Sequence, residues 1–230
     1  MKSWAPNSLT LANLVCGILS IYFSFHQKYE VAAFLIIIAL VADGLDGRVA
    51  RALNVSGDLG KELDSLCDAV SFGVAPAFLI YHYAGFAEMD CSEPLVWLGI
   101  VGALVFAMCG VFRLARFNTM TDVVKGYFLG MPIPAGGCLV ATYVLSDLAF
   151  SPTVSLVLLL VWGPMMVSTF KFPDFKGGDT YRINKIAVGI SVIVGVFLMT
   201  LSLKAVGFAV FFGYMVFGVI NTFLTASKSQ

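Results

Sequence analysis

The strongest constraint on the fold is the arrangement of apolar residues, which fall into eight long runs. These runs cover residues 9–25, 31–47, 64–84, 94–113, 133–149, 152–170, 186–203 and 205–225. A helix of about 20 apolar residues crosses the ~30 Å hydrocarbon core of a bilayer. Only 12% of the 230 residues are charged, whereas a soluble domain carries about a quarter. The sequence therefore predicts an all-α, polytopic integral membrane bundle of about eight transmembrane helices, forming one domain over residues 1–230.

The basic residues predict how this bundle is oriented. If the N-terminus is cytoplasmic and the eight segments alternate, twelve of the 14 Lys and Arg residues lie on the cytoplasmic side and only Lys28 and Lys204 lie opposite. This asymmetry is typical of the positive-inside rule, so both termini are predicted to be cytoplasmic. The net charge is zero, which gives no basic field for nucleic acid. The five cysteines have no CxxC spacing and are predicted to be free thiols.

One predicted cytoplasmic connection is rich in acidic residues. The stretch 41-VADGLDGRVARALNVSGDLGKELDSLCDAV-70 contains six of them between Asp43 and Asp68. Asp43 and Asp46 are three residues apart, and Asp64 and Asp68 are four apart, so each pair shares one face of a helix. Two antiparallel helices joined by a short turn would bring these four carboxylates together at the membrane surface.

Such a cluster needs a cation to offset its cost. A carboxylate in a membrane helix costs ~2.5–3.5 kcal/mol on insertion scales. Ligands that are all carboxylates suit Mg²⁺, Mn²⁺ or Ca²⁺ rather than Zn²⁺, and four of them can hold two ions through shared ligands. Small residues at Gly47, Ala50 and Gly60 leave room for a ligand, and Arg51 suits a phosphate. The alternative is an interfacial loop whose charges only solvate the helix ends.

The pattern Asp43-x2-Asp46-Gly47-x2-Ala50-Arg51-x8-Gly60-x3-Asp64-x3-Asp68 resembles the signature of the CDP-alcohol phosphotransferase family at all eight fixed positions. Further stretches are similar to the phosphatidylserine synthase branch of that family in bacteria and archaea. They are 6-PNSLTLANLVCG-17, 112-FRLARFN-118, 130-GMPIPAGG-137 and 167-VSTFKFP-173. The resemblance implies a helical core in the cell membrane, usually a homodimer, with two divalent metal ions, Mg²⁺ or Mn²⁺, at the cytoplasmic face.

The resemblance also implies a reaction and a role for each motif residue. Members transfer a substituted phosphate from a CDP-linked donor to an alcohol and release CMP. Asp43, Asp46, Asp64 and Asp68 are implied metal ligands, Asp43 and Asp64 bridging both ions, and Asp68 is also the implied general base on the acceptor hydroxyl. The residues expected to contact the CDP group are Asn7, Thr10, Asp46, Gly47, Ala50, Arg51 and Gly60. Asn7 and Thr10 fit a second interpretation equally well, as caps of the first helix.

For the synthase branch, the implied substrates are CDP-diacylglycerol and L-serine, and the products are phosphatidylserine and CMP. A zwitterionic acceptor needs its own polar contacts. Arg113 and Arg116 share a helix face, so they are candidates to hold a carboxylate or a lipid phosphate. Asn118 and Lys125 are further candidates nearby. The alternative is that these residues anchor the chain to lipid headgroups.

Three alternatives to serine transfer also fit parts of the sequence. Within the family, glycerol 3-phosphate and inositol phosphate are the alternative acceptors to serine. A Mg²⁺ transporter predicts carboxylates on both sides of the midplane, whereas here the cluster lies on one side. An Asp-rich prenyltransferase predicts a second acidic motif, but the second half offers only isolated aspartates, such as Asp174 and Asp179.

Overall fold

The computed structural model describes residues 4–55, 57–120, 127–148, 151–173 and 183–226. The first half contains α1 (Trp4–Phe25), α2 (Tyr29–Leu53), α3 (Asp58–Asp68), the π-helical turn η1 (Ala69–Val74), α4 (Ala75–Tyr83), the 3₁₀ turn η2 (Phe86–Glu88) and α5 (Pro94–Met120). The second half contains β1 (Tyr127–Leu129), α6 (Ile133–Leu145), α7 (Pro152–Val167), β2 (Lys171–Pro173), α8 (Lys185–Leu201), the 3₁₀ turn η3 (Leu203–Ala205) and α9 (Val206–Ala226).

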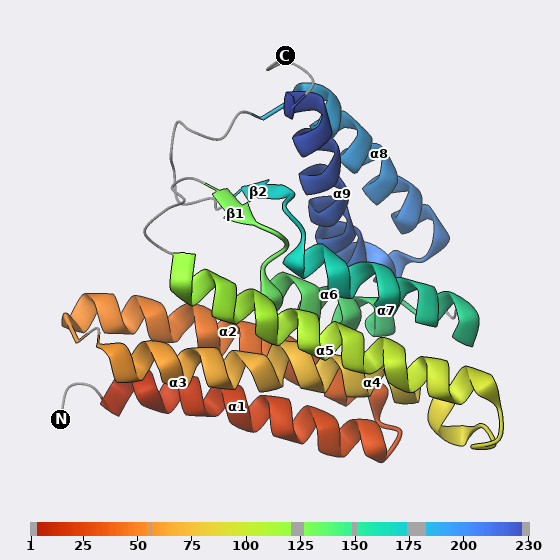
Figure 1. Cartoon of the computed structure of the whole chain (residues 1–230), viewed down its shortest axis with the longest axis horizontal. Coiled ribbons are helices and arrows are strands. Elements are labelled where there is room, and N and C mark those ends of the chain that lie inside the picture. Colours follow the sequence, from red (N-terminus) through yellow and green to blue (C-terminus); the bar gives the residue numbers. More distant parts are fainter. Residues whose placement is uncertain (1–3, 56, 121–126, 149–150, 174–182, 227–230) are drawn as a thin grey trace.

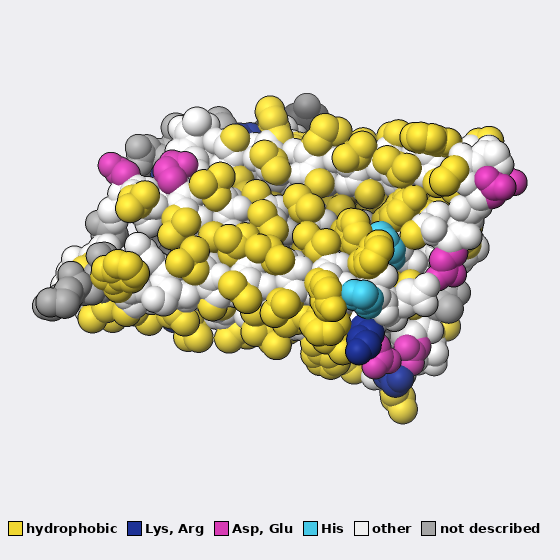
Figure 2. All heavy atoms as spheres, turned by 90° about the horizontal axis from the view of Figure 1, so that it is seen from below, with side chains coloured by type: hydrophobic (Ala, Val, Ile, Leu, Met, Phe, Trp, Pro, Cys, Tyr) yellow, Lys and Arg dark blue, Asp and Glu magenta, His cyan; other side chains and the backbone are white. Residues whose placement is uncertain are grey.

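Within the described residues, four helical stretches are long and apolar enough to cross a membrane. They are Trp4–Phe25, Asp58–Tyr83, Pro94–Thr119 and Leu203–Thr225, and three shorter apolar helices correspond to α6, α7 and α8. Figure 2 shows a broad apolar band on one face, with charged side chains gathered at its two ends. These features confirm the predicted helical membrane protein. The eight crossings and the direction of the chain stay predictions.

The helices are arranged in two parts (Figure 1). Helices α1 and α2, the continuous rod α3–η1–α4, and α5 lie side by side. Helix α6 packs against α2, α4, η1 and α9, and α7 packs along α5. Helices α8 and α9 form a pair that rises steeply from the other helices. The long first part carries the acidic motif on α2 and α3.

Helix α6 is the centre of the core. Ten of its 13 residues are buried, which explains why its sequence is apolar on every side. The fully buried side chains of Phe72, Phe106 and Trp162 belong to the same core, and Trp162 makes an edge-on contact with Tyr143 of α6 at 6.0 Å between ring centres. Aromatic packing of this kind fixes the relative positions of η1, α5, α6 and α7.

A two-stranded antiparallel ladder is an addition to the predicted all-α fold. Strand β1 pairs with β2 so that Phe128 lies opposite Phe172. Gly130 follows β1 with a φ of +74°, and a Cβ there would lie 2.1 Å from the Met166 carbonyl oxygen. Only glycine fits this turn, which carries the chain from β1 into α6.

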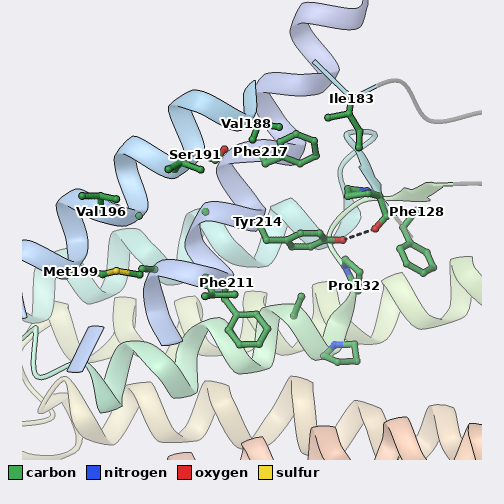
Figure 3. Close-up of a pocket in the computed structure, with 18 of the residues that line it drawn as sticks. Phe128, Pro132, Ile183, Val188, Ser191, Val196, Met199, Phe211, Tyr214 and Phe217 are labelled. Carbon is green, nitrogen blue, oxygen red and sulfur yellow. Dashed lines mark hydrogen bonds between the residues drawn. The ribbon is translucent and has the colours of Figure 1, made fainter. Parts of the chain in front are cut away.

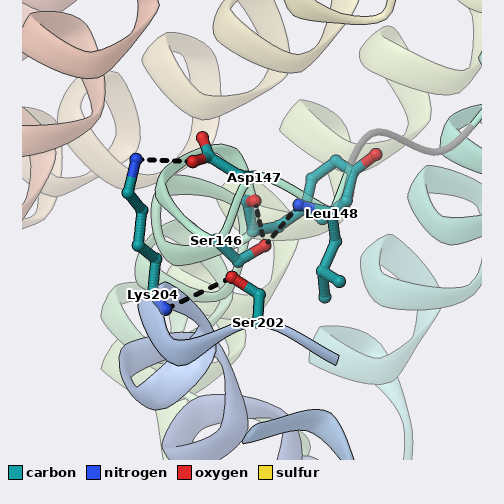
Figure 4. Close-up of polar contacts among 6 residues, drawn as sticks. Ser146, Asp147, Leu148, Ser202 and Lys204 are labelled. Atoms are coloured by element: carbon teal, nitrogen blue, oxygen red, sulfur yellow. Dashed lines mark hydrogen bonds and ion pairs between the residues drawn. The ribbon is translucent and has the colours of Figure 1, made fainter. Parts of the chain in front are cut away.

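The turn between α8 and α9 is attached to the end of α6. The Lys204 Nζ lies 2.6 Å from the Asp147 Oδ2, and the Ser202 hydroxyl accepts from the Lys204 backbone N–H (Figure 4). Both charged side chains are more than half exposed, so this pair contributes little stability. The α8–α9 pair is therefore held mainly by its apolar contacts.

Candidate functional site

The acidic motif forms a helical hairpin of α2 and α3, as its spacing predicts. Helix α2 ends at Leu53 and is capped by Asn54, whose left-handed conformation (φ 52°, ψ 44°) directs its N–H to the Ala50 and Arg51 carbonyls. Asparagine tolerates this conformation better than most residues. Helix α3 then begins at Asp58, after Gly57 at its N-cap. The hairpin brings the two acidic helix faces together.

Three of the four predicted metal ligands converge. Asp43, Asp64 and Asp68 each offer a carboxylate oxygen, and these oxygens all lie within 4.8 Å of one another. The Asp64 Oδ1 is buried and has no hydrogen-bond partner among the described residues. Asp46 is also buried and interacts electrostatically with Asp64. An all-oxygen cluster with an orphaned buried oxygen fits a hard divalent cation.

The residues predicted to contact CDP line a single pocket beside this cluster. Its volume is about 240 Å³, and its walls come from α1, α2 and α3 and from Val55 and Gly57. All seven candidates contribute, together with Asp64: they are Asn7, Thr10, Asp46, Gly47, Ala50, Arg51 and Gly60. A Cβ at Gly60 would meet only the Asn7 Oδ1, at 3.8 Å. Internal packing therefore does not require a glycine at position 60, and the missing side chain leaves more space in the pocket.

Helix α1 supplies hydrogen bonds to two of the aspartates. The Thr10 hydroxyl donates to the Asp46 Oδ2 at 2.6 Å, and the Asn13 amide donates to the Asp68 Oδ1 at 2.9 Å. Thr10 also bonds the Pro6 carbonyl at 3.1 Å, one turn earlier on its own helix. The structure thus connects Thr10 to the carboxylate cluster and not to a cap of α1.

Arg113 lies close to the cluster in an aromatic setting. Its side chain is buried, and its guanidinium lies 5.1 Å from the Phe117 ring centre and 5.7 Å from that of Phe128. Its electrostatic partners include Asp68 and Tyr214. The Nε atom has no hydrogen-bond partner among the described residues. A buried cation with an unused donor next to the acidic cluster can bind an anionic group.

Arg116 has different contacts, although it shares a helix face with Arg113. Its guanidinium donates to the carbonyl oxygens of Leu129 (2.6 Å), Val167 (2.7 Å), Met166 (3.2 Å) and Ser168 (3.2 Å). Three of these carbonyls come from the C-terminal end of α7, which is the negative end of its dipole. Arg116 therefore joins α5 to α7 and β1.

The two remaining candidates differ in what the structure describes. The Asn118 amide donates to the Ser65 hydroxyl at 2.9 Å. Ser65 directly follows Asp64, so this hydrogen bond links α5 to α3 beside the carboxylate cluster. Lys125 lies outside the described residues. The roles of both residues toward a substrate stay predictions.

Sequence reasoning missed three neighbours of the site. Asn13 bonds Asp68, Phe128 packs on Arg113, and Tyr214 interacts with the same arginine. A signal for Asn13 was present, because it follows Thr10 by three residues and so lies on the same helix face. Phe128 and Tyr214 reach the site only through the tertiary packing of β1 and α9.

Comparison with known proteins agrees with this geometry. The family model described as CDP-alcohol phosphatidyltransferase matches residues 3–224. A CDP-diacylglycerol–serine O-phosphatidyltransferase of Helicobacter pylori is 33% identical over 94% of this chain and 90% of its own length. Proteins of the same name in Methanocaldococcus jannaschii and Bacillus subtilis are 34% and 37% identical, over 93% and 76% of this chain and 91% and 92% of their own lengths. The chain belongs to the CDP-alcohol phosphatidyltransferase family.

Proposed function

We propose that this protein transfers the phosphatidyl group of CDP-diacylglycerol to L-serine, giving phosphatidylserine and CMP. The observation that carries the proposal is the pocket that joins all seven CDP-contact candidates to the carboxylate cluster. Relatives that cover nearly the whole chain and carry this activity in their name support the choice of serine.

The chemistry is a displacement at phosphorus. The serine hydroxyl oxygen attacks the phosphorus that carries the diacylglycerol, and the bond from that phosphorus to the oxygen of CMP breaks. Asp68 takes the hydroxyl proton as general base, and CMP leaves with the electron pair of the broken bond. Two divalent ions held by Asp43, Asp46, Asp64 and Asp68 would neutralise the diphosphate and the leaving group.

Arg113 is our candidate for the serine carboxylate. It is a buried cation with a free donor, and it lies near Asp68, so an acceptor held by Arg113 would keep its hydroxyl close to the base. Arg116 donates to four backbone carbonyls, and we assign it to the scaffold. The aromatic rings of Phe117 and Phe128 favour a low dielectric around Arg113, which strengthens its attraction for a carboxylate.

A groove suited to an acyl chain lies beside the site. It has a volume of about 790 Å³ and is lined mostly by apolar side chains of α6, α8 and α9, as Figure 3 shows. Part of the groove wall is formed by Tyr214 and Phe128, and both residues neighbour Arg113. Leu40 also lines the groove, and it precedes Asp43 by three residues on α2. This continuity supports the groove as the place of a lipid tail while its headgroup lies in the site.

The experiment measures CMP release by purified protein in detergent or vesicles. The assay supplies CDP-diacylglycerol, Mn²⁺ or Mg²⁺, and one acceptor at a time: L-serine, glycerol 3-phosphate or inositol phosphate. We expect release with serine, loss of release with EDTA, and near-complete loss in Asp68→Asn. Release with a phosphorylated acceptor and none with serine would contradict the proposed acceptor, and a fully active Asp68→Asn variant would contradict the proposed base.

We also propose eight membrane crossings, both termini and the active site on the cytoplasmic side of the cell membrane, and a homodimer. The apolar segments, the 12-to-2 split of basic residues and the family membership support this arrangement. In this arrangement the polar substrate serine enters from the cytoplasm and the polar product CMP returns to it, while the lipid substrate and the lipid product stay in the bilayer.

A further inference from the structure

Helix α1 has its polar side turned inward. Its buried residues are Pro6, Thr10, Asn13, Gly17, Ser20 and Ser24, which repeat at intervals of three and four. Large apolar side chains such as Val15, Ile18 and Phe25 are exposed on the opposite side. In a membrane helix the small and polar face packs against protein and the apolar face meets lipid. The inward face of α1 is therefore available to order the carboxylates of α2 and α3.

Asn13 is the member of this face that contacts the proposed base. The residue has no exposed surface, and its Nδ2 lies 2.9 Å from the Asp68 Oδ1. The amide nitrogen must face the carboxylate, because the amide oxygen there would bring two acceptors together. The Asn13 Oδ1 is consequently buried with no partner among the described residues. An orphaned buried acceptor costs about 1–3 kcal/mol, so Asn13 does not optimise stability.

The backbones of α1 and η1 lie close together beside this contact. The Ser71 hydroxyl of η1 donates to the Asn13 carbonyl at 2.9 Å. One turn along α1, a Cβ at Gly17 would lie 2.8 Å from the Ser71 Cα, so α1 and η1 are in backbone contact. The π-helical turn begins directly after Asp68, and such turns are frequent at functional sites. Asp68 is thus the last residue of the regular helix α3, and it lies at the point where α1 packs against that helix.

We propose that Asn13 is a positioning residue for Asp68. Its amide occupies the Oδ1 of Asp68 and fixes the rotation of the carboxylate, which leaves the second oxygen to meet the acceptor hydroxyl. The inference rests on the proposed function, because it assumes that Asp68 receives the proton of the acceptor. Asn13 acts through Asp68 and contacts no reacting atom.

The test replaces Asn13 with leucine, which is similar in volume and has no polar atoms. This change removes the orphaned Asn13 oxygen but leaves the Asp68 Oδ1 without its donor, and because these two effects oppose each other we expect a melting temperature within about 3 °C of the wild type. We expect kcat for serine-dependent CMP release to fall about 10- to 100-fold, as for loss of one hydrogen bond to a charged group. The KM for CDP-diacylglycerol and the half-saturating Mn²⁺ concentration should stay within about twofold.

Two further variants keep the test decisive. Asn13→Ser is smaller and cannot reach Asp68, so it should show the same fall in kcat if the leucine variant does not fold. Ser20→Ala removes a buried hydroxyl on the same face of α1, which bonds the Ala32 carbonyl at 2.9 Å, far from the cluster. We expect it to lower stability by roughly 1 kcal/mol and to leave kcat per folded protein unchanged.

The possible results separate the two proposals. An unchanged kcat in both Asn13 variants overturns the positioning role, and so does a rise in the KM for CDP-diacylglycerol at constant kcat, which would make Asn13 a nucleotide contact. A wild-type protein that releases CMP with glycerol 3-phosphate and not with serine contradicts the proposed acceptor alone. In that case the same variants are compared with glycerol 3-phosphate, and the kcat criterion is unchanged.

Discussion

Replacing Arg116 with methionine should destabilise the protein and leave serine binding intact. Replacing Arg113 with methionine should weaken serine binding and change the stability little. The two residues lie one turn apart on α5 and share a face, yet Arg116 donates to four carbonyl oxygens at 2.6–3.2 Å. The buried Nε of Arg113 has no hydrogen-bond partner in the part of the chain that the structure describes. The pair therefore tests which guanidinium belongs to the scaffold and which faces the acceptor.

The magnitude for Arg116 follows from its contacts. Each hydrogen bond to a charged group contributes about 1.5–3 kcal/mol, but bonds to one guanidinium are not additive. The two short bonds, to the Leu129 and Val167 carbonyls, should dominate, which gives a loss of about 3–5 kcal/mol. For a chain of this size, each 1 kcal/mol shifts the melting temperature by about 2–4 °C. The expected fall is thus roughly 6–20 °C, with the KM for serine within about threefold of the wild type.

The expected result for Arg113→Met is the opposite. The variant loses cation–π contacts of about 2 kcal/mol at most, but it also loses a buried unpaired donor, so its melting temperature should change by less than about 5 °C. Loss of about 2 kcal/mol of attraction for a carboxylate raises the KM for serine about 30-fold. The assays are thermal unfolding in detergent and CMP release as a function of serine concentration.

Arg116→Lys provides the control for charge. Lysine keeps the positive charge but lacks the planar set of donors, so it should recover little of the lost stability. A stable Arg116→Met variant with a strongly raised KM for serine would refute this division of roles and return Arg116 to the substrate. A stable, fully active Arg113→Met variant would remove Arg113 from the acceptor site.

Three further predictions concern packing, the groove and the topology. Gly17→Ala should lower both stability, by about 1–3 kcal/mol, and activity, because the new Cβ meets Ser71 at 2.4 Å and overpacks the contact of α1 with η1. Gly189→Ala, with nothing within 4 Å, should be neutral or stabilising, and equal effects of the two changes would contradict the close contact. Gly195→Leu should raise the KM for long-chain CDP-diacylglycerol and spare a short-chain analogue, since each excluded methylene costs about 0.8 kcal/mol; Gly189→Leu on the same helix is the control, and a change independent of chain length would exclude the groove. Cys91, the exposed cysteine between α4 and α5, should react with a membrane-impermeant maleimide on intact cells, and labelling that requires permeabilised cells would reverse the proposed orientation.

The sequence predicted the helices well because their signal is local. Each of the eight apolar runs corresponds to a helix or helical rod of the structure, although α2 and α3 extend into the acidic motif beyond the apolar runs. The ladder between residues 127–129 and 171–173 was not predicted, since strands of three residues leave no periodic pattern. The π-helical turn after Asp68 was also missed, because it depends on how Ser71 and Gly17 pack and not on local propensity.

In the site, too, the local features could be predicted from the sequence and the tertiary contacts could not. Asp43, Asp46, Asp64 and Asp68 were found from their spacing, since residues three and four apart on a helix share a face. The hydrogen bond from Asn13 to Asp68 joins positions 55 residues apart. The four carbonyls bound to Arg116 belong to other elements. Interactions of this kind arise from tertiary packing, and a single sequence carries no direct signal for them.

Helix α1 shows how a carboxylate site can be built in a membrane. A carboxylate cluster in an apolar surrounding needs donors for its oxygens, and lipid supplies none. The hairpin of α2 and α3 contains the charges but must share them with any bound cation, so the donors have to come from a neighbouring helix. Thr10 and Asn13 bond Asp46 and Asp68 from one face of α1. A chain that kept the acidic motif but replaced this face with leucine and alanine would therefore retain its metal ligands and lose their orientation, so we expect it to bind Mn²⁺ and turn over slowly.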